Sequence, residues 1–236
     1  RPLEFDHDAP RDDLSAYVAN MSRNVTFSSE GGDDLPVYQR GHVMFMHSDD
    51  VDVRYAGFVD LGRTDKSEDA FDVSTLSSVD YDTNIKARYS FHFHETGTLD
   101  QENPAIAIGN VVDGNPGWGY VHHGAHAEFT DNIAYDVFGA GFAAEDGDET
   151  GIWLRNMAID IQGIGPGDYT VKDAGDAARH DNGRTGDGFF FAGRLVEAAE
   201  NIAANATNGF VWFHRSAPDG PQTENLDQPE IGYGND

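Results

Sequence analysis

The chain of 236 residues carries 42 acidic side chains against 15 lysines and arginines, a formal net charge of −27 at pH 7. A surface of this sign repels nucleic acid and anionic membranes, so we expect neither as a partner. The sequence has no cysteine, which excludes disulfides and thiolate metal sites, and no apolar run reaches the roughly 20 residues of a membrane span, so we expect no membrane insertion.

The N-terminal part of the chain predicts short strands joined by turns. Residues 1–23 are acidic and lack periodicity, which favours an irregular lead-in. The first strand-like run starts at Asn24. Three more short runs are expected to form one coil of a three-sided solenoid: His42–Met46, Val51–Tyr55 and Phe58–Leu61. Residues 62–83 interrupt this rhythm as a long loop, of a kind that is often functional, before a strand resumes over Ile85–Phe93.

The centre of the chain repeats one unit. The unit is an asparagine, then small or apolar residues, then an aspartate or asparagine, and it begins at Asn110, Asn132, Asn156 and Asn201. The first three copies lie about 22 and 24 residues apart, and the fourth follows after about two such periods. A period in the low twenties, built from β-type runs, predicts a parallel β-solenoid in which each coil stacks on the next at strand spacing.

The C-terminal part continues the solenoid around a second insertion. Residues 163–187 are rich in glycine and are expected to leave the scaffold, with His180 and Asp187 as candidate lid residues. Residues 196–204 have helix propensity, but their fit to the repeat favours strand and turn. The β-helix domain is therefore predicted to span residues 24–215, with residues 216–236 as an acidic tail or cap.

Four polar side chains are expected to share one outer face of the solenoid. Phenylalanine and histidine alternate in the run Phe91–His94, so the two phenylalanines point one way and the two histidines the other. With the phenylalanines inside, the histidines project from the surface. Aligning the next coils on their glycines places another histidine and a glutamate on the same face, whereas His122, Trp212 and His214 pack inward. The predicted cluster is His92, His94, His123 and Glu145.

This cluster has three interpretations. Two histidines at i and i+2 on a strand, with a further histidine and a carboxylate nearby, are a credible ligand set for a divalent metal, zinc or calcium. Glu145 and Asp146 are instead candidate catalytic carboxylates of a general acid/base site. The same side chains are also consistent with a ladder of stacked residues that performs no chemistry. The acidic turn 145–149 is a weaker calcium candidate, because it lacks the EF-hand pattern.

Five segments resemble a family of parallel β-helix proteins that includes the cell-surface and cell-migration-inducing hyaluronidases and the fibrocystin-like receptors. Within about residues 40–165 they occur in order: Gly62–Ser67, Arg88–His94, Gly117–His123, Asn132–Asp136 and Ala143–Glu149. The resemblance implies a right-handed parallel β-helix, an extracellular or cell-surface location and a polysaccharide ligand. It also implies that His92, His94, Glu145 and Asp146 lie at the surface that this family shares. The chain departs from the family at Gly139–Phe142, where relatives have a histidine.

Two functions of different classes follow. The first is an extracellular carbohydrate-active protein that binds or hydrolyses a polysaccharide, hyaluronidase-like, as a glycoside hydrolase. Glu145 or Asp146 would act as acid or base, and the sugar would be contacted by Arg88, Lys66, Arg63 and Trp118. The alternative is a non-catalytic structural or adhesive module of a larger surface protein, with the cluster as a structural metal site.

The charge bears on both functions. Acid-rich surfaces with few lysines are typical of proteins that work in high salt, where ions screen self-repulsion, and an ordinary acidic secreted protein has the same composition. A net charge of −27 repels an anionic glycan unless salt screens it or a cation bridges the two, whereas a neutral glycan meets no such barrier.

Overall fold

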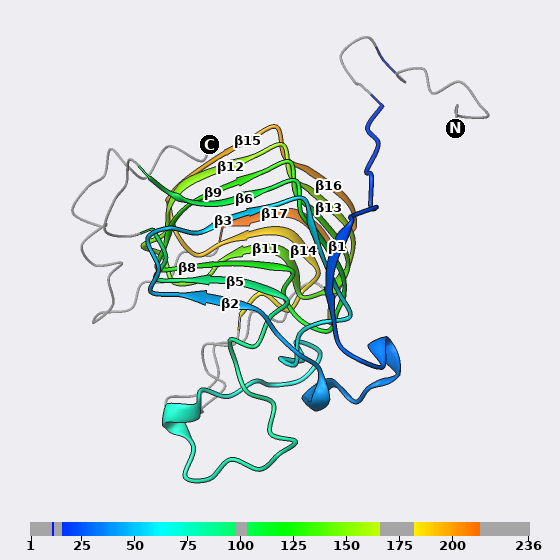
Figure 1. Cartoon of the computed structure of the whole chain (residues 1–236), viewed down its shortest axis with the longest axis vertical. Coiled ribbons are helices and arrows are strands. Elements are labelled where there is room, and N and C mark those ends of the chain that lie inside the picture. The colour runs from blue at the N-terminus through cyan, green and yellow to red at the C-terminus, as the bar shows by residue number, and fades with distance from the viewer. Residues whose placement is uncertain (1–10, 12–15, 98–102, 166–181, 213–236) are drawn as a thin grey trace.

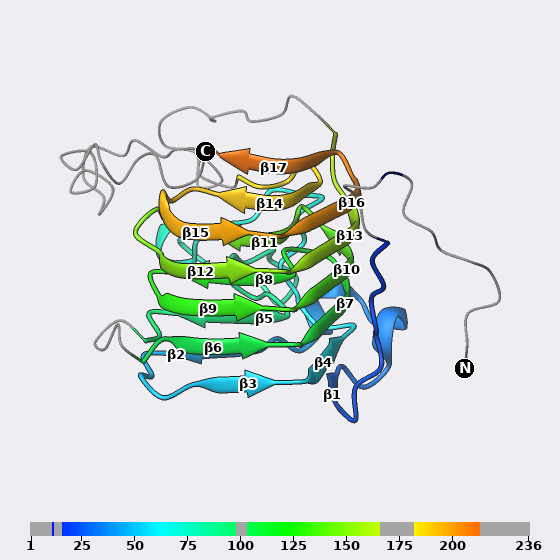
Figure 2. The same ribbon diagram turned by 90° about the horizontal axis from the view of Figure 1, so that it is seen from above.

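The structure is a computed structural model that describes residue 11 and residues 16–97, 103–165 and 182–212. These residues form a three-sided parallel β-helix, in which the chain rises from the N-terminal coil to the C-terminal coil with a right-handed sense (Figure 2). The predicted fold class, an all-β right-handed parallel β-helix with two long insertions, is confirmed.

Each full coil gives one strand to each of three parallel sheets (Figure 1). The first sheet contains β1 (Val25–Ser28), β4 (Ala56–Val59), β7 (Val111–Asn115), β10 (Ile133–Phe138), β13 (Met157–Gln162) and β16 (Ile202–Ala206). The second contains β2 (Met44–Met46), β5 (Phe91–His94), β8 (Tyr120–His123), β11 (Ala140–Ala144), β14 (Asp187–Phe191) and β17 (Asn208–Trp212). The third contains β3 (Asp52–Arg54), β6 (Ala105–Ile108), β9 (His126–Thr130), β12 (Thr150–Leu154) and β15 (Leu195–Ala199). Three short 3-10 helices lie in the connections: η1 (Gly32–Asp34), η2 (Val37–Gln39) and η3 (Val73–Thr75).

The repeated asparagines form a buried ladder at the start of the first sheet. The Asn110 side chain donates to Asn132 Oδ1 over 3.1 Å, and the Asn132 side chain donates to Asn156 Oδ1 over 3.0 Å. The same oxygens accept the backbone N–H of the preceding coil, as from Asn110 to Asn132 over 2.9 Å. Each asparagine therefore satisfies polar groups in two coils, which explains why the repeat keeps this residue type.

The interior is filled by aromatic rings stacked from coil to coil. Tyr120, Phe142, Phe189 and Phe210 form one column, with ring centroids 4.7, 5.0 and 4.9 Å apart. They come from equivalent positions of β8, β11, β14 and β17, because the strands pair in register. Burial of these rings against one another is the main source of stability in such a core.

Both insertions leave the helix at the same corner, between the first and second sheets. Residues 60–90 connect β4 to β5, and residues 163–186 connect β13 to β14. The described parts of the two insertions contact each other. Arg184 donates to the backbone oxygens of Lys66 over 2.8 Å and Ser67 over 2.9 Å, and pairs with Asp69 over 2.6 Å.

Most expected strands are found, with one correction. The runs expected as the first coil correspond to β2, β3 and β4, and residues 196–204 form β15 and β16 as strand and turn. The strand expected over Ile85–Phe93 is wrong in its first half, because β5 begins only at Phe91 and Ile85 makes an isolated bridge with Phe71. The predicted tail 216–236, most of the lead-in, His180 and His214 lie outside the described residues.

Candidate functional site

The outer face of the second sheet carries the predicted cluster. Phe91 and Phe93 of β5 are buried in the core, so His92 and His94 take the opposite face. His94 pairs with His123 of β8, and the backbone N–H of Glu145 donates to His122 O, which continues the same register into the next coil. His94, His123 and Glu145 therefore form one column on adjacent coils, as expected from the alternation.

His122 confirms this register from the inner side. It is fully buried, its ring centroid lies 5.4 Å from that of Phe129, and its Nε2 lies 2.7 Å from Ala125 O. Trp212 also has the inward register, because it pairs with the core residue Phe191 and its ring stacks on that ring at 5.2 Å. It is 49% exposed and belongs to β17, an end strand of the second sheet.

Three of the four predicted residues bring their ligand atoms together. One donor atom from each of His92, His123 and Glu145 lies within 4.8 Å of the other two. His123 Nδ1 is 3.3 Å from Glu145 Oε2. Two donors that bind one zinc ion at about 2.1 Å in a tetrahedron lie about 3.4 Å apart, so this pair already has the required spacing. We call these three residues the inner cluster.

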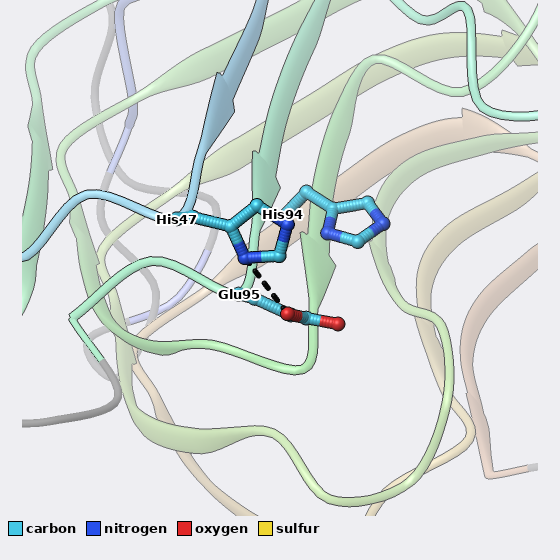
Figure 3. Close-up of side chains that lie close together, drawn as sticks. All are labelled: His47, His94 and Glu95. Carbon is cyan, nitrogen blue, oxygen red and sulfur yellow. Dashed lines mark ion pairs between the residues drawn. The ribbon is translucent and has the colours of Figure 1, made fainter.

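His94 belongs to a different group. Its ring centroid is 4.5 Å from that of His123, but its ligand atom groups with those of His47 and Glu95 (Figure 3). The four predicted metal ligands are therefore divided between two adjacent clusters. Sequence alternation placed His94 on the correct face and could not show the two turn residues beside it, which follow the ends of β2 and β5.

The prediction that His92 projects from the surface is wrong, because the side chain is fully buried. The outer face is covered at this place by a second apolar cluster, which includes Tyr89, Trp118, Val121 and Phe190. The ring of Tyr89, at the end of the first insertion, lies 5.7 Å from that of His92. Strand alternation predicts which face a side chain takes, but the path of an insertion across that face is a tertiary feature.

The inner cluster contains one neutral histidine and one ion pair. Burial lowers the pKa of His92 to about 3, so its ring is neutral at pH 7. Its Nδ1 lies 3.3 Å from Ala87 O, and its Nε2 has no hydrogen-bond partner among the residues that the structure describes. A ring that donates from Nδ1 to a backbone oxygen keeps the Nε2 lone pair available as a ligand, which is a common arrangement around protein-bound metals.

The pKa values of His123 and Glu145 are shifted in opposite directions. Burial lowers the pKa of His123, but the Glu145 carboxylate outweighs this effect and raises the pKa to about 9. Burial raises the pKa of Glu145, but the charge and hydrogen bond of His123 outweigh it and hold the pKa well below the usual range. Near pH 7 the pair is an imidazolium beside a carboxylate, so Glu145 is a base or a ligand and not a proton donor.

In the acidic turn after β11, the second glutamate, Glu149, binds the backbone of the turn. Fully buried Glu149 accepts the backbone N–H groups of Asp146 over 2.6 Å and Gly147 over 2.7 Å. Burial raises the pKa of Glu149 to about 7, although these bonds act in the opposite direction. This carboxylate organises the turn through its hydrogen bonds to the backbone. The Asp146 side chain is partly buried, and its catalytic role remains a prediction.

Two of the predicted sugar-binding residues line a cavity. Arg63 and Arg88 border a cavity of about 300 Å³ together with Tyr38 and Tyr81, whose rings lie 5.4 Å apart. Burial and the charge of Arg63 lower the pKa of Arg88, and both side chains border the same cavity. No sequence pattern selects the two tyrosines, because they lie in two connections that contain no motif.

The other two predicted sugar-binding residues lie in the interior. Lys66 is 1% and Trp118 2% exposed, and Lys66 Nζ is 3.9 Å from the centroid of the Trp118 ring. Lys66 also donates to Asn182 O over 3.0 Å, which joins the two insertions. A polysaccharide on the surface does not reach either side chain in this arrangement, because the insertions close over them. We therefore assign both to packing.

Together these features define a parallel β-helix domain with a histidine–carboxylate cluster beneath two insertions. The CEMIP beta-helix family model matches residues 76–231, more than half of the chain, so the protein belongs to that family. The resemblance drawn from the sequence motifs is confirmed.

Two curated relatives support the assignment. Communication mutant protein F of Dictyostelium discoideum is 26% identical over 205 residues, covering 84% of this chain and 16% of that protein. A G8 domain-containing protein of the same organism is 31% identical over 242 residues, covering 97% of this chain and 14% of that protein. The chain thus spans less than a fifth of the length of these relatives. No solved structure matches, and the described residues contain no helix long and apolar enough to cross a membrane.

Proposed function

We propose that this chain is the carbohydrate-active module of a larger extracellular protein, and that it binds and hydrolyses a polysaccharide beside the inner cluster. One observation supports this function above the others. His92, His123 and Glu145 bring three ligand atoms within 4.8 Å of one another, and His92 is buried, neutral and open at Nε2. Structural stacking alone does not require a buried imidazole nitrogen without a partner.

The inner cluster fits a transition metal better than calcium. Two imidazoles and one carboxylate are the ligand types that zinc prefers, with His123 giving up its proton when the ion binds, whereas calcium is held by six to eight oxygens. When bound, such an ion supplies Lewis acidity and lowers the pKa of a bound water. Around it, the fixed Nδ1 contact of His92 would orient one ligand, and the ionised Glu145 would supply a carboxylate ligand.

The arginine cavity is the proposed sugar contact. Arg63 and Arg88 form a local positive site in a chain of net charge −27, and two tyrosine rings beside them offer faces for sugar stacking. A carboxylated sugar would be held by this pair in spite of the negative charge elsewhere, because close contacts outweigh distant screened charges. A neutral sugar would use the rings alone.

A non-catalytic module with a structural metal is the second candidate. The full burial of His92 favours it, because structural zinc sites are closed whereas catalytic sites keep one position open. In that case the metal would fasten the insertions to the helix, and the chain would act in adhesion or assembly.

Glycan degradation by the purified chain tests the proposed function. A panel of anionic and neutral polysaccharides is incubated with the wild type, His92→Ala and Glu145→Gln, each with and without a chelator. The matched control is His126→Ala, which removes a half-buried histidine of β9 that hydrogen-bonds Thr150 on the third sheet.

We expect shortening of one polysaccharide by the wild type and His126→Ala, and none by the two cluster variants or after chelation. Metal that raises the melting temperature without any glycan cleavage would reject the enzyme in favour of the structural module. Equal cleavage by all four proteins would remove the inner cluster from the reaction.

A further inference from the structure

A second group of ligand-type side chains lies beside the inner cluster and faces solvent. His47, His94 and Glu95 each place one donor atom within 4.8 Å of the other two (Figure 3). His47 Nδ1 and Glu95 Oε2 are 2.8 Å apart, with side chains 57% and 52% exposed. The ring centroids of His47 and His94 are 5.7 Å apart. We call these three residues the outer cluster.

The backbone brings these side chains together by a repeated bend. His47 and Glu95 each follow the last residue of a strand, and both have left-handed backbone conformations, with φ of 51° and 50°. Their N–H groups donate to the equivalent oxygens of the next coils, His94 O and His123 O. The two bends therefore stack, and the side chains project side by side.

A second carboxylate lies next to this group. A Cβ on Gly124 would meet Glu95 Cγ at 3.5 Å and Asp148 Oδ1 at 3.9 Å, so the two acidic side chains flank the same glycine. Asp148 Oδ1 is buried and has no hydrogen-bond partner among the described residues. Neighbouring carboxylates repel each other, and a cation beside them would reduce that cost.

We propose that His47, His94 and Glu95 form a second, solvent-accessible site for a divalent transition metal, with Asp148 as a nearby carboxylate. The donor set of two imidazoles and a carboxylate matches that of the inner cluster and selects zinc, cobalt or nickel over calcium. Because the side chains are exposed, the outer site exchanges its metal readily, whereas the inner site is closed. This inference does not depend on the proposed glycan hydrolysis, since it concerns binding alone.

The contrasting interpretation is an ordinary surface ion pair. An exposed His47–Glu95 pair contributes little to stability and holds no ion. The two interpretations differ in metal stoichiometry, because a surface pair leaves the inner cluster as the one high-affinity site in the described part of the chain.

Cobalt titration of the metal-free chain tests the site. Co²⁺ bound by imidazole and carboxylate groups gives visible absorption bands, and zinc competition gives the affinities. The variants are His47→Ala and Glu95→Gln for the outer cluster, His92→Ala for the inner cluster, and His126→Ala as the control. His47 and Glu95 are exposed, so their substitution should leave the circular dichroism and melting temperature of the metal-free protein unchanged.

We expect two equivalents of Co²⁺ to bind the wild type and His126→Ala. His47→Ala and Glu95→Gln should lose the weaker equivalent. The affinity for that ion should fall by at least roughly 10- to 100-fold, which is the cost of losing a residue that only hydrogen-bonds to a metal ligand. His92→Ala should keep that equivalent and lose the tighter one. Binding that is unchanged in His47→Ala would overturn the outer site, and so would a wild type that binds one equivalent removed by His92→Ala. Neither result would decide whether glycan is cleaved.

Discussion

At the scale of single residues, one buried side chain per coil holds adjacent coils together. Asn132 accepts the N–H and side-chain amide of Asn110 and donates to Ala107 O over 2.8 Å. The geometry requires an amide, because one atom must accept while another donates. Aspartate lacks the donor, and alanine lacks both.

Replacement of Asn132 by alanine is expected to lower the free energy of unfolding by about 3 kcal/mol, because buried donors and an acceptor in the neighbouring coils lose their partners. Urea denaturation of the wild type, Asn132→Ala and the exposed control Asn24→Ala measures the difference. A loss for Asn132→Ala no larger than that of the control would show that the ladder does not contribute to stability.

The partly buried His42 side chain is expected to contribute to the pH dependence of stability. Burial, followed by the charges of Arg63 and Arg88, lowers its pKa to about 4 in the folded chain, against about 6.5 when unfolded. The folded pKa is depressed, so this contribution to stability is complete above pH 6.5 and is lost as the pH falls from 6.5 toward 4.

In His42→Gln the fall in stability between pH 6.5 and 4 should be shallower than in the wild type. The difference should be less than about 1.4 kcal/mol per pH unit, because the residue is only partly buried. Urea midpoints at four pH values give both slopes. Parallel slopes would mean that His42 titrates normally in the folded protein.

At the scale of elements, the two insertions act as one cover. Arg184 in the second insertion bonds to Lys66, Ser67 and Asp69 in the first. Lys66 in turn lies over Trp118 and lowers the pKa of Glu145. The inner cluster is buried because these segments meet above it.

Arg184→Ala should open this cover without unfolding the helix. Hydrogen exchange in residues 62–83 is expected to accelerate at least about tenfold, in keeping with the loss of several charge-assisted hydrogen bonds. Exchange in β8 and β11 should stay slow. Arg155→Ala, which removes an exposed ion pair with Asp131 between coils at another corner, is the control and should leave residues 62–83 unchanged. Equal exchange in both variants would contradict the role of Arg184.

The repeat was sufficient to predict the strands of the coils, but it did not predict the path of the two insertions. The asparagine period and the Phe91–His94 alternation were sufficient for the coils, the register and the face of each histidine. They could not predict that His92 is covered or that Lys66 and Trp118 pack together, because the path of the insertions across the coils follows no period. His47 and Glu95 were missed because strand alternation does not extend into the left-handed bends.

At the scale of the whole molecule, charge and shape act together. The acidic groups of a chain with net charge −27 are distributed along a solenoid, so like charges repeat from coil to coil. Asp60 and Asp113 illustrate this: burial first, and then neighbouring aspartates, raise the pKa of both carboxyl groups.

Salt should therefore stabilise this protein. Raising potassium chloride from about 0.05 M to 1 M shortens the Debye length from roughly 14 Å to 3 Å and weakens the repulsion between coils. We expect the melting temperature to rise by several degrees, and equally with sodium chloride, because screening is not specific for the ion. A melting temperature that does not change with salt would show that the acidic surface carries no net cost.

The central claim is that the inner cluster binds a metal ion, and the metal content of the protein tests this claim most directly. The wild-type chain, His92→Ala and Glu145→Gln are loaded with zinc, dialysed and analysed for bound metal, with His47→Ala beside them to separate the outer cluster. We predict tightly held zinc in the wild type and His47→Ala and its loss in both inner-cluster variants. Zinc absent from all four proteins, or retained equally by all, would contradict the assignment of His92, His123 and Glu145 as a metal site.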